Sequence, residues 1–348
     1  MVYADSESSQ KNYDKYYEQF SKYEDTKTAS GGGYTPSDRS RLDEMASVLA
    51  EHLKPSDSIL DIGCVNGGLL EALSCRGFTN LTGIDPSLVS IEHIQQRGFK
   101  GYASIISELN KDKVGKYKAI IISHVLEHIF DVTSTMEIMK SLLDEDGLLY
   151  IEVPDALHYF HHYVVPFYYF DPEHINHFDY HALINLADLH GFEVISWSEK
   201  TIRISDNIDY PAIYAIFKKH PTGNPYRIEL SFDLKSSVLN FIEQSKQDNK
   251  IKKIEYYANN GNPIILWGAG SYTQRLMAST RLLECNIVAI VDSDKNKQGL
   301  YLHSIPIQYP DIVHNLEGTI IISAALYAEE IKRDISAMGL KNTVAILC

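Results

Sequence analysis

Histidine and acidic side chains gather in one stretch of the sequence, residues 154–182. Within it, Glu173 stands directly before His174, and further histidines occur at positions 158, 161, 162, 177 and 181. A histidine with a pKa of about 6.5 can accept the proton of a hydroxyl group near neutral pH, and a neighbouring carboxylate can fix its tautomer. The pairing predicts general base chemistry, with His174 as the base and Glu173 as its partner.

Two other interpretations of these histidines stay open. The spacing of His174, His177 and His181 could place three rings on one face, around a divalent metal. Magnesium prefers carboxylates and water to imidazole, and the sequence assigns no metal to the chain. The stretch could also serve only to anchor its own loop.

The motif HVLEH at residues 124–128 contains a further candidate, His128. Its H-x-x-E-H pattern is that of inverted zinc peptidases, in which both histidines lie on one helix. Here the motif follows a buried strand directly, so its first residues form a loop and a zinc peptidase is disfavoured. His128 is predicted as an active-site residue, with a capping or core role as the alternative.

The sequence LDIGCVNGG (60–68) combines an apolar strand, a glycine turn and the start of a helix. Glycine lets the backbone approach a ligand closely, and the helix N-terminus adds a positive dipole. An aspartate ends the next strand about 20 residues later, where a carboxylate can accept both ribose hydroxyls of an adenosine. The pattern predicts a nucleoside cofactor, lined by Asp61, Gly63, Cys64, Asn66, Gly67, Asp85 and Pro86.

A second glycine turn lies in LWGAGSYTQ at residues 266–274. It carries Gly268 and Gly270, has Gln274 where a third glycine would complete the dinucleotide pattern, and is followed by Asp292 after the next strand. Three interpretations stay open: docking of a nucleotide or substrate, a purely structural turn, and binding of a dinucleotide.

Both turns belong to alternating apolar and helix-period segments. Runs of Ile, Leu and Val without polar alternation predict strands buried on both faces, as in a parallel sheet. We expect strands at 58–63, 80–85, 117–123, 147–153, 192–197 and 213–219, and helices at 36–53, 68–74, 88–96, 132–143 and 182–190. The fold class is therefore α/β, with a doubly wound, mostly parallel sheet.

A chain of 348 residues is long enough for two domains, and the segment 220–225, rich in proline and glycine, is the clearest linker signal. The strand and turn pattern then repeats after residue 261, which predicts a second, smaller Rossmann-like domain. We expect an N-terminal helical lid or tail (1–40), a cofactor domain (41–219), a linker and helix (220–260), and the second domain (261–348).

Composition excludes several classes of function. The 32 basic and 46 acidic residues leave a net charge of −14, which repels phosphate backbones and disfavours a nucleic-acid partner. No apolar run reaches the roughly 18 residues of a membrane span, and the first residues do not resemble a signal peptide. The four cysteines form no C-x-x-C pair. We expect a cytoplasmic protein with free thiols, and a homodimer is left open.

Four segments within residues 41–219 are similar, in order, to the motifs of one enzyme family: SILDIGCVNGGLLEAL, LTGIDPS, YKAIIISHVLEHIFD and LLDEDGLLYIEVP. On them the chain resembles a class I S-adenosylmethionine-dependent methyltransferase. The resemblance implies S-adenosyl-L-methionine as cofactor and S-adenosyl-L-homocysteine as product. It places Asp61 and Gly63 at the methionine end, Asp85 at the ribose hydroxyls, Ser123 and His124 at the methionine ammonium, and the region near Ser107 at the adenine.

Two further segments are similar to methyltransferases that act on sugars. DPEHINHF (171–178) resembles the E-H-x-x-Y-F stretch of enzymes for nucleotide-linked sugars, with His177 where those often carry tyrosine. VDSDKNKQG (291–299) is similar to the C-terminal domain of sugar C-methyltransferases, whose N-terminal zinc module this chain lacks. The resemblance implies O-methylation of a sugar, in a nucleotide-sugar or a surface glycan, with His177, Tyr34, Gly268 and Gly270 at the substrate.

One residue departs from the family pattern. The family usually carries glycine where this chain has Val65, and a β-branched residue disfavours a positive φ. Two alternatives stay open beside O-methylation, and Val65 bears on the second. One is C- or N-methylation of a nucleotide-sugar, and the other is a non-catalytic scaffold that binds a sugar nucleotide and has a degenerate cofactor site.

Overall fold

The computed structural model describes residues 1–3, 32–170, 173–205, 208–220, 233–325 and 327–347. They form two compact units, each with its own core. The first comprises Met1–His158 and Glu173–Lys235, and the second comprises Tyr159–Pro172 and Ser236–Cys348. Most of the expected N-terminal lid or tail, residues 4–31, lies outside the described residues.

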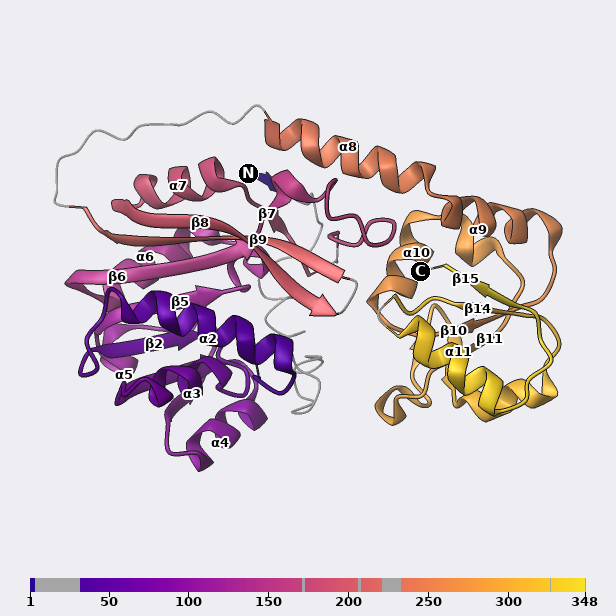
Figure 1. The fold of residues 1–348 in the computed structure, drawn as a ribbon, viewed down its shortest axis with the longest axis horizontal. Coiled ribbons are helices and arrows are strands. Elements are labelled where there is room, and N and C mark those ends of the chain that lie inside the picture. Colours follow the sequence, from indigo (N-terminus) through magenta and orange to yellow (C-terminus); the bar gives the residue numbers. More distant parts are fainter. Residues whose placement is uncertain (4–31, 171–172, 206–207, 221–232, 326, 348) are drawn as a thin grey trace. The chain divides into compact units, whose positions relative to one another are not determined.

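A seven-stranded sheet in the order β4-β3-β2-β5-β6-β9-β8 forms the centre of the first unit (Figure 1). The first five of these strands are parallel, and β9 runs antiparallel to both β6 and β8. The strands are β2 (Ser58–Ile62), β3 (Asn80–Asp85), β4 (Lys100–Ala103), β5 (Tyr117–Ser123), β6 (Leu143–Pro154), β8 (Phe192–Ser205) and β9 (Ile208–Lys219).

The last two strands are longer than their apolar runs predicted. Beyond the level of Pro154, where β6 ends, β8 and β9 pair only with each other, up to Ser205 and Ile208. Among the described residues no further strand pairs with this two-stranded ribbon, so its residues need not be apolar. The apolar pattern of a buried strand therefore does not reveal it.

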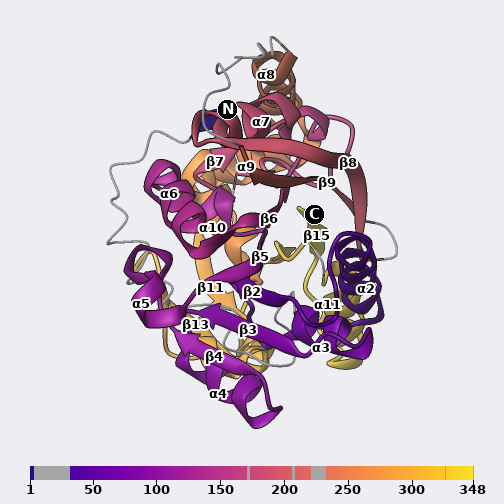
Figure 2. The ribbon, with the colours of Figure 1, turned by 90° about the vertical axis from the view of Figure 1, so that its left-hand side faces the viewer.

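Helices cover both faces of this sheet (Figure 2). One core cluster lies under α2 (Pro36–Ala50), α3 (Gly68–Cys75) and α4 (Leu88–Gln96). The other lies under α5 (Lys111–Val114), α6 (Val132–Leu142) and α7 (Tyr180–Leu189). Helix α2 begins where the sequence predicted, because the Thr35 hydroxyl accepts the backbone N–H of Asp38 at 3.1 Å.

The strand order reverses at β2, which has β3 on one side and β5 on the other. In doubly wound sheets, a crevice opens outside the carboxyl ends of the strands at such a switch point, and ligands bind there. Asp61, Asp85 and Ser123 stand at or next to these strand ends. The fold therefore brings the three predicted cofactor residues to one edge of the sheet.

The histidine-rich stretch does not stay within one unit. Its short helices and strands in the first unit are η4 (Ala156–His158) and β7 (Asn176–His177), and β7 pairs with the N-terminal β1 (Val2–Tyr3). Residues 159–172 belong instead to the second unit, where Val165 is buried in the core. The sequence had assigned this segment to the cofactor domain and drawn a single linker at 220–260.

The second unit is a smaller α/β unit, with the strand order β12-β13-β11-β10-β14-β15. All of its neighbouring strands are parallel except β12 and β13. The strands are β10 (Ile264–Trp267), β11 (Ile287–Val291), β12 (Tyr301–Leu302), β13 (Ile305–Gln308), β14 (Thr319–Ile322) and β15 (Val344–Ile346). The helices are α8 (Asp233–Gln247), α9 (Asn249–Asn260), α10 (Ser271–Ser279) and α11 (Ala328–Ala337).

The predicted fold class, α/β with a second and smaller unit, is confirmed. Among the residues that the structure describes, no helix combines the length and the apolar character that crossing a bilayer requires.

Candidate active site

Asp85 is held in place by the glycine turn that follows β2. Its Oδ2 accepts the backbone N–H of Val65 at 3.0 Å, and its Oδ1 accepts the backbone N–H of Ser87 at 2.9 Å. The side chain is buried. A carboxylate oxygen has more than one acceptor site, so each oxygen can still accept a ligand hydroxyl. The turn and the carboxylate thus form one preorganised unit.

Steric contacts explain the glycines of this turn. Gly63 and Gly67 both have positive φ, 77° and 78°. A Cβ at Gly63 would overlap Val125, and a Cβ at Gly67 would lie 2.7 Å from Ile94 Cγ2. The N–H of Gly63 donates to the Ile84 carbonyl at 2.8 Å, so it serves to tie the turn to β3. The glycines here make room for close packing as well as for a ligand.

Val65 takes the backbone conformation that its side chain disfavours. Its φ is 46°, in the left-handed region that glycine adopts readily and that β-branched residues avoid. The hydrogen bond from its N–H to Asp85 offsets part of this strain. The turn therefore keeps the glycine geometry although it lacks the glycine.

Burial perturbs both aspartates of the site. It raises the pKa of Asp61 to about 7, with a further increase from the nearby Asp85 and a partial decrease from Arg41. Burial likewise raises the pKa of Asp85 to about 6, against the lowering effect of its two backbone N–H donors. Each carboxylate would be stabilised in its ionised form by a cationic or hydroxyl-bearing ligand.

Asn66 carries the clearest sign of a ligand site in this turn. Its side chain is fully buried, and neither its amide oxygen nor its amide nitrogen has a hydrogen-bond partner among the described residues. Buried amides without partners are costly, and a polar ligand would satisfy this one. The donor set therefore fits a nucleoside cofactor, with Asp61, Asn66, Asp85 and the partly buried Pro86 to hold it.

Two further predicted cofactor residues, Cys64 and Ser107, differ in their surroundings, since Cys64 is buried and Ser107 is exposed. Cys64 is buried, and a Cβ built on Gly83 would lie 2.6 Å from its Sγ, so this thiol packs against β3. Ser107 is exposed on η2 (Ile106–Glu108), whereas the nearby Ser104 is buried and its N–H donates to the Asp85 carbonyl at 3.1 Å. The segment next to Asp85 is thus Ser104, three residues before the predicted position.

His124 follows β5 directly and has a positive φ of 53°. Its Nδ1 lies 3.3 Å from Glu127 Oε1, and its Nε2 lies 3.2 Å from Glu152 Oε1. Burial acts to lower the pKa of His124, but the two carboxylates outweigh it and raise the pKa. The Ser123 hydroxyl also donates to Glu152 Oε1, at 3.3 Å. Both predicted residues therefore meet at one buried acid.

That acid, Glu152 on β6, was not singled out by the sequence analysis. It is fully buried and accepts the Tyr150 hydroxyl at 2.7 Å. Two cations pair with it, Lys200 of β8 at 2.8 Å and Arg41 of α2 at 3.4 Å. The signal that could have identified it is a single acidic residue inside the apolar run GLLYIEVP.

Glu152 stays ionised because of these partners. Burial alone would raise its pKa, but His124, Lys200 and Arg41 together hold the pKa well below its usual range. A buried carboxylate with several cationic partners is strongly coupled to each of them. This network connects α2, β5, β6 and β8 beside the cofactor edge, so it fixes the position of His124.

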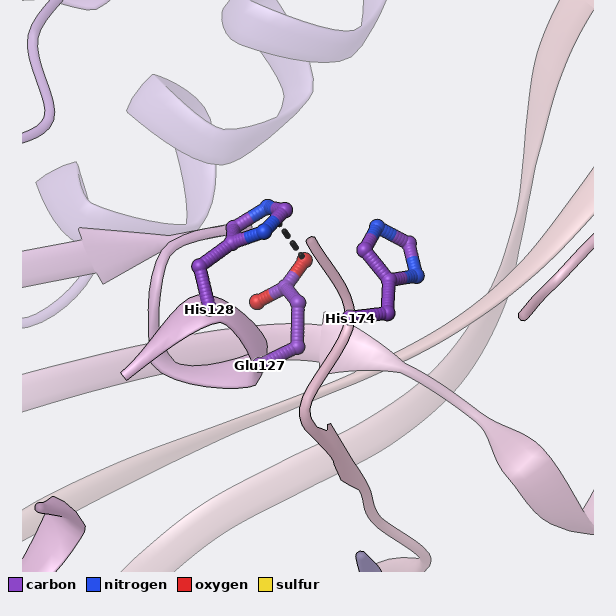
Figure 3. A group of neighbouring side chains, drawn as sticks. All are labelled: Glu127, His128 and His174. Carbon is purple, nitrogen blue, oxygen red and sulfur yellow. Dashed lines mark ion pairs between the residues drawn. The ribbon is translucent and has the colours of Figure 1, made fainter. Parts of the chain in front are cut away.

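Glu127, His128 and His174 form a compact group of side chains (Figure 3). One ligand atom from each lies within 4.8 Å of the others, and in Figure 3 the Glu127 side chain stands between the two rings. The Nδ1 atom of His128 lies 2.8 Å from the Glu173 carbonyl oxygen. Its other ring nitrogen, Nε2, lies 3.9 Å from Glu127 Oε1. Glu127 is buried, and its Oε2 has no partner among the described residues.

This group could hold a divalent metal, since a buried carboxylate and two imidazoles are common ligands of such ions. The structure also shows two contacts among the predicted residues Glu173, His128 and His174. The backbone carbonyl of Glu173 lies 2.8 Å from His128 Nδ1. His174 lies edge-on to His128, with ring centroids 4.8 Å apart.

The predicted substrate residues are divided between the two units, with His177 and Tyr34 in the first and Gly268 and Gly270 in the second. His177 is buried in β7, and burial lowers its pKa to about 4. The Tyr34 hydroxyl lies 3.3 Å from His93 Nε2, on α4. Gly268 and Gly270 belong to the second unit, at the carboxyl end of β10. There the N–H of Ala269 donates to Asp292 Oδ2 at 2.8 Å.

Comparison with known families gives two matches. Residues 37–197 match a family model described as a methyltransferase domain. Residues 260–346 match a second model, described as C2185-like, N-terminal. The two matches do not overlap, and the second lies wholly within the second unit.

Two curated relatives match part of the chain, and both are named ubiquinone biosynthesis O-methyltransferase. The one from Pelagibacter ubique is 34% identical over 98 residues, which is 27% of this chain and 40% of that protein. The one from Acinetobacter baumannii strain AYE is 30% identical over 113 residues, which is 30% of this chain and 45% of that protein. The chain thus spans less than half the length of these relatives.

Among solved structures, one similar chain is the 1,6-didemethyltoxoflavin-N1-methyltransferase of Burkholderia thailandensis, crystallised with 1,6-didemethyltoxoflavin and S-adenosylhomocysteine. The identity is 16% and the TM-score 0.46, over 63% of this chain and 95% of that one. At this similarity the fold assignment rests on the strand order of the present chain and on the family model. Residues 37–197 thus match a methyltransferase-domain model, in agreement with the family resemblance of the sequence.

Proposed function

We propose that this protein transfers the methyl group of S-adenosylmethionine to a hydroxyl group of a small molecule, and that the acceptor is a sugar in a nucleotide-sugar or glycan. The observation that carries the proposal is the unit formed by Asp85 and the glycine turn, with the Val65 N–H on Oδ2 at 3.0 Å. Asp85 would hold the ribose hydroxyls, and Asp61 and Asn66 would face the rest of the cofactor.

The cofactor, when bound, supplies a methyl group on a positively charged sulfur. The residues of this chain bind it, exclude water and align the acceptor oxygen with the methyl carbon, and alignment contributes most of the rate in such reactions. A histidine at the same edge would take the hydroxyl proton, with His174 as the candidate from the sequence. The sugar acceptor is supported by the resemblance of DPEHINHF and VDSDKNKQG to sugar methyltransferases.

A second candidate acceptor is a hydroxyl compound of ubiquinone biosynthesis. It is favoured by the printed names of these two relatives, which match 27% and 30% of this chain. Both candidates are O-methylations, so they share the cofactor site and differ in the acceptor.

A methyl-transfer screen with isotope-labelled S-adenosylmethionine separates these acceptors. Nucleotide-sugars and phenolic compounds are offered side by side, and mass spectrometry locates the added methyl. We expect the label on a sugar hydroxyl. Label on a phenol alone supports the second candidate, and label on carbon or nitrogen contradicts O-methylation. Absence of S-adenosylhomocysteine binding by calorimetry would favour the non-catalytic scaffold.

A further inference from the structure

A buried aspartate holds one histidine ring at the carboxyl edge of the sheet. Asp155 directly follows β6 and is 2% exposed, and its Oδ2 lies 2.7 Å from Nδ1 of His158. Its Oδ1 accepts the backbone N–H of Leu157 at 3.1 Å, so the carboxylate is fixed through both oxygens. The side chain of His158 is 32% exposed. The ring is therefore accessible from outside while the carboxylate that orients it is not.

This pair lies at the edge that carries the cofactor residues. Ser123 pairs with Glu152 in the sheet, and Asp155 comes three residues later along the same chain segment. The N–H of His124 donates to the Glu152 carbonyl at 2.8 Å, which places the ends of β5 and β6 side by side. The N–H of Asp155 in turn donates to the Pro211 carbonyl at 3.0 Å. The pair is thus anchored to the rigid centre of the sheet.

We propose that His158 accepts the proton of the substrate hydroxyl and that Asp155 is its positioning residue. The inference rests on the proposed methyl transfer and names the base for it. With Nδ1–H directed at the Asp155 carboxylate, the basic lone pair of the ring is on Nε2. In the step, the acceptor oxygen bonds to the methyl carbon, the carbon–sulfur bond breaks with its electron pair left on sulfur, and the hydroxyl proton goes to Nε2.

The surrounding charges suit a ring that becomes positive. One carboxylate oxygen of Glu199, on β8, lies within 4.8 Å of a carboxylate oxygen of Asp155 and of a ring nitrogen of His158. Together the two carboxylates would stabilise the imidazolium that proton transfer creates. An aspartate that orients a histidine and stabilises its cationic form is the arrangement that general bases of this kind use.

Three other candidate histidines are less suited to this role. His128 is buried and bonds through Nδ1 to a backbone carbonyl, with Glu127 3.9 Å from its Nε2. Burial lowers the pKa of His177 to about 4, so its ring is a weak base at neutral pH. His174 belongs to the group with Glu127 and His128, so it is a candidate metal ligand or a structural residue.

The test compares four variants in the full chain, with the acceptor identified by the methyl-transfer screen. His158→Gln is expected to lower kcat by about 10²- to 10⁴-fold, the usual contribution of a general base. The affinity for S-adenosylhomocysteine should stay unchanged, and added imidazole should restore part of the rate. Asp155→Asn is expected to lower kcat by about ten-fold or more, because the amide no longer favours the reactive tautomer.

A matched control is available in His190, whose Nδ1 lies 2.8 Å from Glu137 Oε1. This pair has similar geometry but lies near the start of β8, since Phe192 is level with the beginning of β6. His190→Gln should therefore keep the kcat of the unchanged protein. His174→Gln serves as the comparison for the base expected from the sequence.

The pH profile separates a base from a structural residue. With S-adenosylmethionine saturating, kcat/KM for the acceptor should rise with pH in the unchanged protein, and the part of this rise that comes from the base should vanish in His158→Gln. The ionisations of Asp61 and Asp85, whose pKa values burial raises to about 7 and about 6, should remain in both proteins. A His158→Gln variant with unchanged kcat overturns the inference, as does a loss that is equal at every pH and accompanied by loss of S-adenosylhomocysteine binding. Failure of the unchanged protein to methylate any acceptor overturns the proposed function and this inference together, whereas an active protein with an active His158→Gln variant overturns the inference alone.

Discussion

The backbone N–H of Val65 donates to Asp85 Oδ2 at 3.0 Å, across the carboxyl ends of two neighbouring parallel strands. The second unit contains the same relationship, between the N–H of Ala269 and Asp292 Oδ2 at 2.8 Å. In both units a glycine turn after one strand is held by an aspartate from the next. In the second unit, however, Lys297 Nζ also lies 3.0 Å from Asp292 Oδ2, so this carboxylate already has a cationic partner.

Replacement of Val65 by glycine should relieve backbone strain. A β-branched residue at positive φ destabilises the folded state by about 1–3 kcal/mol, and glycine would remove this strain. Glycine also has more conformational freedom in the unfolded chain, which offsets about 1 kcal/mol of the gain. We expect Val65→Gly to keep or raise the free energy of unfolding, measured by urea denaturation. Val89→Gly is the matched control, because this exposed residue of α4 has ordinary helical surroundings and its replacement should cost about 1 kcal/mol. A comparable loss in both variants would contradict the strain at Val65.

Asp85→Asn should weaken cofactor binding without unfolding the protein. The amide keeps only one acceptor oxygen, whereas Asp85 accepts backbone N–H groups on both of its oxygens. Loss of charge-assisted bonds worth about 1.5–3 kcal/mol corresponds to about 10- to 100-fold lower affinity. Isothermal calorimetry with S-adenosylhomocysteine measures the change. The exposed Asp112 of α5 provides the control, and Asp112→Asn should bind as tightly as the unchanged protein.

The raised pKa of Asp61 should make the ligand-free protein less stable as the pH increases. Burial raises this pKa from 3.8 to about 7, so between these values the folded state holds a proton that the unfolded state has released. The contribution of Asp61 to stability therefore falls as the pH rises from about 4 to about 7. We expect Asp61→Asn to raise the free energy of unfolding at pH 8, by a smaller amount at pH 5. A gain that is the same at both values would show that ionisation of Asp61 is not its cause.

Glu152→Gln should destabilise the protein strongly. The change leaves the half-buried cations Arg41 and Lys200 without the buried carboxylate that they share. The loss of one partner from a buried ionic group costs about 3–5 kcal/mol. Chemical denaturation measures the cost. Adding Lys200→Met to the variant should recover part of it, because one uncompensated cation is then removed. Glu71→Gln, which breaks an exposed pair with Arg97, should cost less than about 1 kcal/mol.

Local sequence patterns were sufficient for most strands of the first sheet and for the glycine turn after β2, but not for β4 or for the extended ends of β8 and β9. The apolar run before Asp61 and the spacing to Asp85 depend on neighbouring residues and on one crossover, and both follow general rules of α/β folds. The positive φ at Val65 could also be anticipated, because a glycine is usual at that position of the motif.

Contacts between distant segments could not be predicted in the same way. Glu152 meets Arg41 and Lys200 only because α2 and β8 are brought to the end of β6 by the complete fold. His158 was one histidine among several in its stretch. What sets it apart is its contact with Asp155, which depends on how the Asp155 side chain is oriented after β6 ends. The sequence showed which residue types were present in the stretch but not which of them touch.

The passage of residues 159–172 through the second unit limits how the protein can be divided. Tyr159 and Tyr169 are stacked with ring centroids 4.0 Å apart, and both pack against Phe241 of α8. A chain that ended before α8 would keep this aromatic segment and lose the surface that covers it. Such a fragment should aggregate, although it contains every residue of the cofactor turn. The two units therefore cannot be separated by a single cut, and a gene that encodes only the methyltransferase domain would also have to lack the segment from Tyr159 to Pro172.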